Sequence, residues 1–540
     1  MNRFKASKFK NTTPKIPKKD EWISDVRAGS AASCGNHIKS SCSLIAFNME
    51  QGGGGVLGLV SLDNGNKEKR SVSQLHCHAD LVTDLDFSPF DDFLLATCSA
   101  DETVKVWRLL EPGQTMPSSP GVTLSPGGGR VENVLFHPTA DGVLATGAGR
   151  VATVWDAAQQ SQLAALEDHG DQIQSLSWKQ DGSLLATSCR DKKLRIFDAR
   201  AQLTAVQSAQ GHQSNKDSRV IWIGDTDNVL CAGFNQMRER EVRVWDARKM
   251  GSSVGSVSLD TSPGTLIPLF DPDTGLLVLA GMGDCVMHCF EVTASQPVLS
   301  QVSQCLTETA TRGIAMVPKL ALDVTSCEVV RVLQLTDSFI VPVSYSVPRK
   351  SGQDFHGDLY PDTPGDSPAL PAEEWWSGGT NRVQKVSLDP AKRPIRSFSS
   401  AVIPCSVGGA KPEPTNQPTK KELPIEKNRK EVRRAGFSVS LFFQLSPHST
   451  SFSPLSLVPP LFPLLLSIPP PSSPSLSPLP GPSSKLRHTQ SLVLHRDTHI
   501  TNLKGLNLTT PGECDGFCVN SKRGVPLASG GQIARARVWE

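Results

Sequence analysis

The 540-residue sequence lacks features that several classes of protein require. Its 55 basic and 53 acidic side chains leave a formal net charge of +2, so no overall field attracts it to nucleic acid. Its 13 cysteines are odd in number and follow no framework-like spacing, which favours a reducing compartment over a disulfide scaffold. None of its short Cys/His clusters has metal-site spacing. We therefore expect no metal, no cofactor and no nucleic-acid partner.

The sequence also lacks a secretory signal and an uninterrupted membrane-spanning run. The basic stretch 1–19 is not followed by an apolar segment. The one hydrophobic tract, residues 451–468, contains four prolines, which are incompatible with a regular helix of bilayer-spanning length. These absences predict a cytoplasmic protein with peripheral membrane association at most.

A repeated aromatic residue is the strongest positive signal in the chain. It recurs every 42 to 48 positions and closes the same short pattern each time, with apolar residues one and three before it and a polar residue two before it. This alternation is typical of a strand with one buried face. A period in the forties built from strands predicts a β-propeller, one blade per repeat. The closing residues are Trp107, Trp155, Phe197, Trp245 and Phe290.

Acidic residues and histidines stand at fixed places around these strands. Asp101, Asp191 and Asp284 each precede a closing aromatic by six residues, and His78 and His169 lie near the entrance of two repeats. This pattern resembles the WD40 repeat, in which a buried Asp–His–aromatic hydrogen-bond network pins a tight turn. The resemblance implies a structural role for these residues, which we prefer to a catalytic Asp–His pair.

Five repeats are evident, and two further blades complete the expected ring. Strand-like runs in residues 40–62 and 302–345 can supply two irregular blades. We expect the N-terminal strand to close the circle against the C-terminal one, because closure removes exposed strand edges. The predicted fold is all-β: a seven-bladed WD40-type β-propeller.

Several stretches beyond the repeat resemble the coronins, a family of actin-associated propeller proteins. Residues 232–246 are similar to the family's fourth-blade signature, and 270–274 to a later blade. The segment 347–376, with Asp358-Leu-Tyr-Pro-Asp-Thr363 and Glu373-Glu-Trp375, resembles the extension that packs across the underside of coronin propellers. The resemblance covers residues 1–395, which we expect to form the propeller and its extension.

The beginning of the sequence resembles the coronins as well, and its motif returns later. Ser7-Lys-Phe-Lys10 is similar to the family's opening, and residues 25–27 to its first strand. A related motif at 484–488 is typical of the long, tandem-propeller coronins. We expect residues 396–482 to be a disordered Pro/Ser/Leu-rich linker. We expect residues 483–540 to be the truncated start of a second unit that does not fold independently, from a truncated product or a mis-spliced gene.

Three catalytic patterns in the sequence are chance matches. A nucleophile-elbow pattern requires a strand-to-helix turn in an α/β sheet, and a dinucleotide loop requires a helix after it. A kinase catalytic-loop pattern requires a lysine strand and a metal-binding Asp-Phe-Gly. None of these contexts is predicted, so we expect no enzyme. The matches are residues 251–255, 53–58 and 495–502 respectively.

The resemblance implies a non-enzymatic scaffold that links actin-filament binding with Golgi and endosomal vesicle traffic. Candidate partner-binding residues are Lys8, Lys10 and Arg27; a second arginine that short coronins carry is matched by Ser30. The N-terminal lysine cluster could meet an actin filament or anionic lipid, or serve only solubility. The implied locations are the cytoplasm, Golgi membrane, trans-Golgi network and vesicles.

The alternative function is a trafficking adaptor without actin contact. In that case the blade surfaces recruit vesicle-coat or ubiquitin-ligase components. Short coronins end in a heptad coiled coil, whereas no apolar heptad run follows residue 395 here. We therefore expect a monomer.

Overall fold

The computed structural model of the chain describes residues 7–29, 32–52, 54–63, 70–110, 114–294, 296–349, 355–393 and 402–403. The chain divides into two compact units, residues 1–419 and 420–540, and all described residues belong to the first. Apart from residues 402–403, the expected linker 396–482 and second-unit start 483–540 lie outside the described residues. The fold below is therefore that of the first unit.

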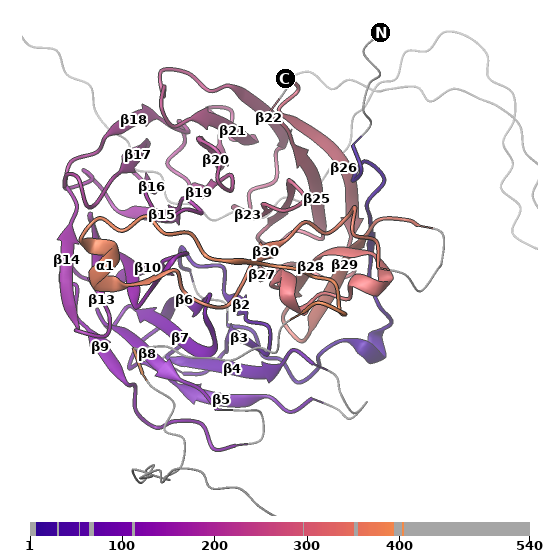
Figure 1. Cartoon of the computed structure of the whole chain (residues 1–540), viewed down its shortest axis with the longest axis horizontal. Coiled ribbons are helices and arrows are strands. Elements are labelled where there is room, and N and C mark those ends of the chain that lie inside the picture. Colours follow the sequence, from indigo (N-terminus) through magenta and orange to yellow (C-terminus); the bar gives the residue numbers. More distant parts are fainter. Residues whose placement is uncertain are drawn as a thin grey trace, which may run out of the picture. The chain divides into compact units, whose positions relative to one another are not determined.

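The described residues form seven four-stranded antiparallel sheets arranged as blades around a central axis (Figure 1). This arrangement confirms the predicted seven-bladed propeller. Blade 1 contains β2 (Ile38–Ser40), β3 (Leu44–Asn48), β4 (Val56–Ser61) and β5 (Ser73–His76). Blade 2 contains β6 (Val82–Ser88), β7 (Asp91–Ser99), β8 (Val104–Arg108) and β9 (Val122–Leu124). Blade 3 contains β10 (Val131–Phe136), β12 (Val143–Ala148), β13 (Val151–Asp156) and β14 (Ser161–Ala165).

The remaining blades follow the same order from the axis outward. Blade 4 contains β15 (Ile173–Trp178), β16 (Leu185–Cys189), β17 (Lys193–Phe197) and β18 (Gln207–Gln210). Blade 5 contains β19 (Arg219–Trp222), β20 (Asn228–Phe234), β21 (Arg240–Asp246) and β22 (Gly255–Asp260). Blade 6 contains β23 (Leu266–Asp271), β24 (Leu276–Gly281), β25 (Val286–Val292) and β26 (Leu299–Leu306). Blade 7 contains β27 (Gly313–Met316), β28 (Glu328–Leu335), β29 (Ile340–Ser346) and β1 (Thr13–Lys15).

The N-terminal strand closes the ring, as the sequence predicts. β1 is the outermost strand of blade 7 and pairs antiparallel with β29, with Thr13 opposite Ser346 and Lys15 opposite Ser344. The two irregular stretches supply strands of blades 1 and 7, except that residues 302–306 belong to β26 of blade 6. The N-terminal and C-terminal parts of the propeller are thereby joined through backbone hydrogen bonds, and the edge of β29 that would otherwise be exposed is paired.

The expectation that residues 25–27 form the first strand is wrong. Ile23 forms an isolated bridge with Ile340 of blade 7, and Ala28 forms one with Met49 beside blade 1. The chain between these bridges crosses from one blade to the next, and the carbonyl of Arg27 accepts from the backbone N–H of Glu50 at 2.8 Å without forming a strand ladder. Asp25 takes a left-handed conformation, with φ 63°, to make this crossing.

The core lies between the faces of neighbouring blades. The closing aromatic side chains of Trp107 and Phe197 are almost fully buried; half-buried positions flank the buried ones in β8, whereas every residue of β17 after Lys193 is buried. One apolar cluster joins Val104 and Val106 of blade 2 to Val134 and Leu144 of blade 3. Each sheet therefore buries its apolar residues against the next sheet, and the ring is stabilised blade to blade.

The segment 355–393 crosses one face of the disc, which we call the underside; the opposite face is the top. Figure 1 shows this extension in orange, running from blade 7 toward blade 3. β31 (Leu370–Pro371) pairs in parallel with β11 (Ala140–Asp141) of blade 3, and α1 (Ala372–Trp376) follows it. β32 (Lys385–Val386) then returns to pair with β30 (Thr363–Pro364). This confirms the extension that the sequence predicts on one face.

A tryptophan anchors the far end of the extension. Trp375 is 2% exposed, and its ring lies 4.6 Å from that of His137 and 5.9 Å from that of Trp178. Its indole N–H donates to the carbonyl of Gly182 at 3.3 Å.

Three short 3-10 turns also occur among the described residues: η1 (Lys19–Glu21), η2 (Lys319–Ala321) and η3 (Val324–Ser326). No helix within the described ranges is long and apolar enough to cross a membrane.

Candidate interaction surfaces

The predicted repeat network is most fully connected in blade 2. His78 Nδ1 lies 2.9 Å from Asp101 Oδ2, and His78 Nε2 lies 2.8 Å from Thr97 Oγ1. The indole N–H of Trp107 donates to the same hydroxyl oxygen at 3.1 Å. We assign the ring proton to Nδ1, because Nε2 can then accept from the hydroxyl that accepts from tryptophan. The four side chains form one relay from the buried aromatic to the turn.

Blade 4 keeps only part of this relay. His169 Nε2 lies 2.9 Å from Thr187 Oγ1, as in blade 2. Asp191, however, accepts from Arg195 at 2.6 Å, and His169 Nδ1 lies instead beside a backbone carbonyl. Phe197 has no N–H to donate, and its ring lies 5.3 Å from that of His169. Asp191 and His169 are therefore not joined by a hydrogen bond, unlike Asp101 and His78 in blade 2.

Blade 5 has a histidine that the sequence reasoning missed. His212 Nδ1 lies 3.1 Å from Glu241 Oε1, and the indole N–H of Trp245 donates to Cys231 Sγ at 3.1 Å. Burial would lower the pKa of His212, but Cys231 and Glu241 outweigh burial and raise it to about 9. The available signal was Gly211-His212 at the blade entrance, in the place that His78 and His169 occupy in their blades.

Blades 3 and 6 use other partners. The indole N–H of Trp155 donates to Thr146 Oγ1 at 3.0 Å, in a blade without an acid at the turn. In blade 6 the predicted Asp284 accepts a hydrogen bond from Arg240, a 2% exposed side chain of blade 5. Phe290 is buried in the core. Asp284 thus joins two blades rather than closing a histidine network.

The predicted partner-binding residues lie on two different faces. The Ser346 end of β29 faces the underside, and there the ammonium group of Lys8 donates to the carbonyl of Asp358 in the extension at 2.7 Å. Arg27 follows the bridge at the opposite, Ile340 end of β29 and is exposed on the top. Lys8 and Arg27 therefore cannot belong to one flat contact on either face.

Basic side chains nevertheless follow the outer edge of blade 7 from the underside to the top. We call Lys10, Lys15, Lys18 and Arg27 the basic rim. All four are exposed, and within the described part of the chain no hydrogen bond or ion pair engages their side chains. Neighbouring Lys19 differs, because it pairs with Glu308 at 2.6 Å. The rim is the surface that joins the two predicted clusters.

Arg27 also lines an open notch at the junction of blades 7 and 1. The notch has a volume of about 670 Å³, and its walls include Met49, Val72 and Phe339. An exposed guanidinium beside apolar walls can stack as well as pair with a carboxylate. The notch therefore offers a partner both charge and apolar surface at the top of the basic rim.

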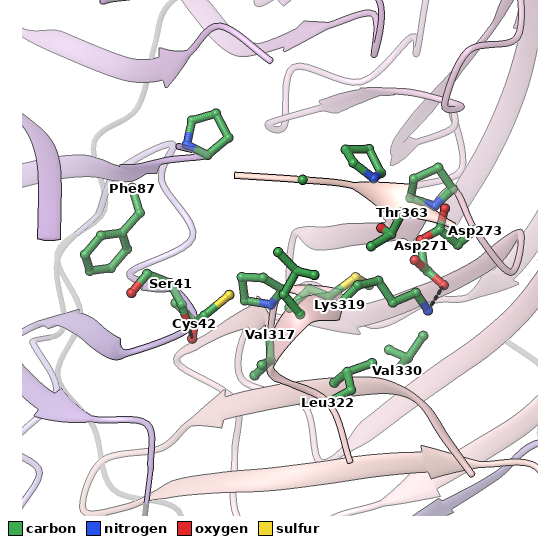
Figure 2. A pocket seen from close by; sticks show the side chains of 18 of the residues that line it. Ser41, Cys42, Phe87, Asp271, Asp273, Val317, Lys319, Leu322, Val330 and Thr363 are labelled. Carbon is green, nitrogen blue, oxygen red and sulfur yellow. Dashed lines mark hydrogen bonds and ion pairs between the residues drawn. The ribbon is translucent and has the colours of Figure 1, made fainter. Parts of the chain in front are cut away.

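A second cavity, of about 350 Å³, lies on the underside beneath the extension. Figure 2 shows apolar side chains around it, including Phe87 of blade 2 and both Val317 and Leu322 of blade 7. The ammonium group of Lys319 donates to Asp271 Oδ2 at 2.6 Å, so the strongest charge at this site is paired within the protein. The cavity is chiefly an apolar recess, lined also by the Lys319–Asp271 ion pair and by the carboxylates of Asp92 and Asp273.

Comparisons with known protein families agree with this architecture. Residues 2–67 match a domain of unknown function, DUF1899. Residues 69–108 and 160–198 match the WD domain, G-beta repeat, and residues 340–383 match a further type of WD40 repeat. The matched segments include the basic rim, blades 2 and 4, and the start of the extension.

Relatives with known names cover most of the chain. Coronin-7 of Homo sapiens is 54% identical over 538 residues, which are 99% of this chain and 56% of the relative, so the chain spans about half of that protein's length. Coronin-2A of Bos taurus is 33% identical over 407 residues, 73% of this chain and 76% of the relative. The solved WD40 domain of Toxoplasma gondii coronin, at 29% identity and a TM-score of 0.66, covers 71% of this chain and 98% of that one. The chain belongs to the coronin family.

Proposed function

We propose that this chain is a non-enzymatic scaffold that binds actin filaments and links them to Golgi and endosomal vesicle traffic. Members of the coronin and WD40 propeller families are typically non-enzymatic. The observation that carries the actin contact is the basic rim, where exposed cations along one blade edge have no partner among the residues that the structure describes. An acidic filament surface is the kind of partner that such an edge fits.

The form of the rim supports contact with an extended partner. Within the described sheets β1 is the edge strand of blade 7, so its side away from β29 faces outward, and Lys15 lies within it. Lysine on an edge strand discourages pairing with another strand while it leaves charge available for a partner. Because these cations are exposed, their contribution is expected to weaken as salt rises.

Co-sedimentation of the whole chain with actin filaments tests this proposal. We expect pelleting at low salt and less at moderate salt. The double substitution Lys10→Glu and Lys18→Glu should weaken binding about tenfold, since two attractive pairs become repulsive. Arg27→Glu alone should weaken it by a smaller factor, because it reverses one charge.

A matched control changes the same charge elsewhere. Lys193 and Lys249 are exposed on blades 4 and 5, away from the rim. Lys193→Glu with Lys249→Glu should leave pelleting close to that of the unchanged chain. Equal loss in both double variants would show a nonspecific charge effect and overturn the rim as the contact. Absence of pelleting at low salt would discard actin binding and favour the adaptor for vesicle-coat or ubiquitin-ligase components.

We also propose that the chain is cytoplasmic and reaches Golgi membrane, trans-Golgi network and vesicles by peripheral association. Its resemblance to the long coronins supports this location. Fluorescence microscopy of the tagged chain against Golgi and endosomal markers tests it. A uniformly diffuse signal that no marker overlaps would contradict the trafficking part of the proposal while leaving the actin test independent.

A further inference from the structure

A short segment beyond the extension packs on the underside at the junction of blades 2 and 3, a site that we call the groove. Val402 is 8% exposed and belongs to the apolar cluster that contains Trp155 and Ala157 of blade 3 and Val122 of blade 2. Ile403 packs against the same cluster. Two adjacent branched aliphatic side chains therefore enter the junction of two blades from outside the propeller repeat.

Two glycines give the groove room for these side chains. A Cβ atom at Gly121 would lie 2.2 Å from Ile403 Cδ1, and a Cβ atom at Gly142 would lie 3.2 Å from Val402 Cγ2. Gly142 also has φ +75°, which glycine adopts without strain. Gly121 has no such backbone requirement, and the three atoms nearest to a Cβ placed there all belong to Ile403.

An arginine fixes the main chain of the bound segment. Arg108 donates from Nε to the carbonyl of Ile403 at 3.0 Å, and its Nη2 donates to the same oxygen. Its Nη1 donates to Asp91 Oδ2 at 2.5 Å, and Asp91 is 1% exposed. The buried carboxylate holds the guanidinium in place, so the donors toward the carbonyl are set by the propeller itself.

We propose that this groove is a binding site for a short peptide of a partner protein, and that Val402–Ile403 occupies it in cis. The partner segment carries two adjacent branched aliphatic residues, and the main-chain carbonyl of the second accepts hydrogen bonds from Arg108. The recognition elements are two side-chain recesses and one carbonyl contact, none of which requires covalent continuity with the propeller. The chain's own segment therefore acts as a competitor that such a partner displaces. This inference does not depend on actin binding.

Fluorescence anisotropy with a labelled peptide of the sequence Ser-Ser-Ala-Val-Ile-Pro, matching residues 399–404, tests the proposal. The whole chain with Val402→Asp and Ile403→Asp has its own segment removed from the groove. We expect the peptide to bind this variant at least about tenfold more tightly than the unchanged chain, because the cis competitor is gone. No binding to the variant, or equal binding to both chains, would overturn the proposal.

Gly121→Ala tests whether the peptide binds in this groove, because it blocks the groove specifically. Added to the Val402→Asp/Ile403→Asp chain, it fills the isoleucine recess and should abolish peptide binding. Gly251→Ala is the matched control, since a Cβ atom there meets nothing within 4 Å and its backbone needs no positive φ. Thermal unfolding checks that each variant folds, and Val402→Gly with Ile403→Gly provides a second emptied chain. Retained binding in a folded Gly121→Ala variant would place the peptide elsewhere and overturn the assignment.

Discussion

Blades 2 and 5 place a histidine at the same point of the repeat and surround it differently. In blade 2, the hydroxyl of Thr97 lies between His78 and the closing Trp107. In blade 5, the sulfur of Cys231 accepts a hydrogen bond from the indole N–H of Trp245. His212 is hydrogen-bonded to a glutamate of strand β21. The acid of blade 2 lies in the turn instead. One backbone position therefore serves two different polar arrangements.

The difference decides which histidine carries charge. Burial lowers the pKa of His78 to about 4, and this outweighs the attraction of Asp101. The pKa of His212 is raised to about 9, since Cys231 and Glu241 prevail over burial. At neutral pH, the uncharged ring of His78 takes part in the hydrogen-bond relay of blade 2. In blade 5, protonated His212 forms a buried ion pair with Glu241. Similar blade geometry thus rests on interactions with opposite dependence on pH.

The largest expected effect comes from removing the acid of blade 5. Glu241 is buried and pairs with both His212 and Arg243, the latter at 2.6 Å. Glu241→Ala leaves a buried cation without its partner and should lower the free energy of unfolding by about 3 kcal/mol. Urea unfolding followed by tryptophan fluorescence measures the change.

Asp101→Ala is the matched change in blade 2. Because His78 is neutral, it loses a hydrogen-bond partner and not a charge partner, and the expected loss is about 1–2 kcal/mol. If the two variants lose equal stability, or if Asp101→Ala loses more, the distinction between a charged and a neutral blade is wrong.

The repeat itself could be predicted from sequence because it depends on local alternation. Trp107 and Trp245 close strands whose apolar positions alternate, and this pattern requires no knowledge of distant residues. The partners of the predicted acids could not be predicted in the same way. Asp284 accepts a hydrogen bond from Arg240 of the preceding blade, and Asp191 accepts one from Arg195, four residues later in the chain. Side-chain reach and blade-to-blade spacing decide between such partners.

The candidate surfaces show the same limit. The sequence identified Lys10 and Arg27 as candidate partner-binding residues. Their separation depends on the path of residues 13–28, which run along the outer edge of blade 7 from the underside to the top. The groove that holds Val402 was not predicted at all. Its walls come from two blades, and its recesses exist because glycines stand at positions 121 and 142, far from 402 in the sequence.

The relay in blade 2 can be tested at its central hydroxyl. Thr97 Oγ1 lies within hydrogen-bond distance of both His78 and Trp107, whereas Thr187 in blade 4 contacts His169 alone among the corresponding side chains. Thr97→Val should lower the free energy of unfolding by about 2 kcal/mol and Thr187→Val by about 1 kcal/mol. Urea unfolding of both variants measures the difference. A larger loss at Thr187 would contradict a relay that extends to the aromatic in blade 2.

The smallest expected effect concerns pH and separates the two histidines most directly. The pKa of His78 is depressed in the folded state, so its contribution to stability is lost as pH falls below about 6.5 toward 4. The pKa of His212 is raised, so its contribution is complete below about 6.5 and is lost as pH rises through about 9. His78→Gln should therefore reduce the acid loss, measured between pH 7 and 5, by on the order of 1 kcal/mol. His212→Gln should instead flatten the profile between pH 7 and 9, as followed by thermal unfolding in matched buffers. Each glutamine variant keeps a polar side chain but cannot titrate. If both variants changed the pH dependence of stability on the same side of pH 7, the two blades would not differ in the charge of their histidines.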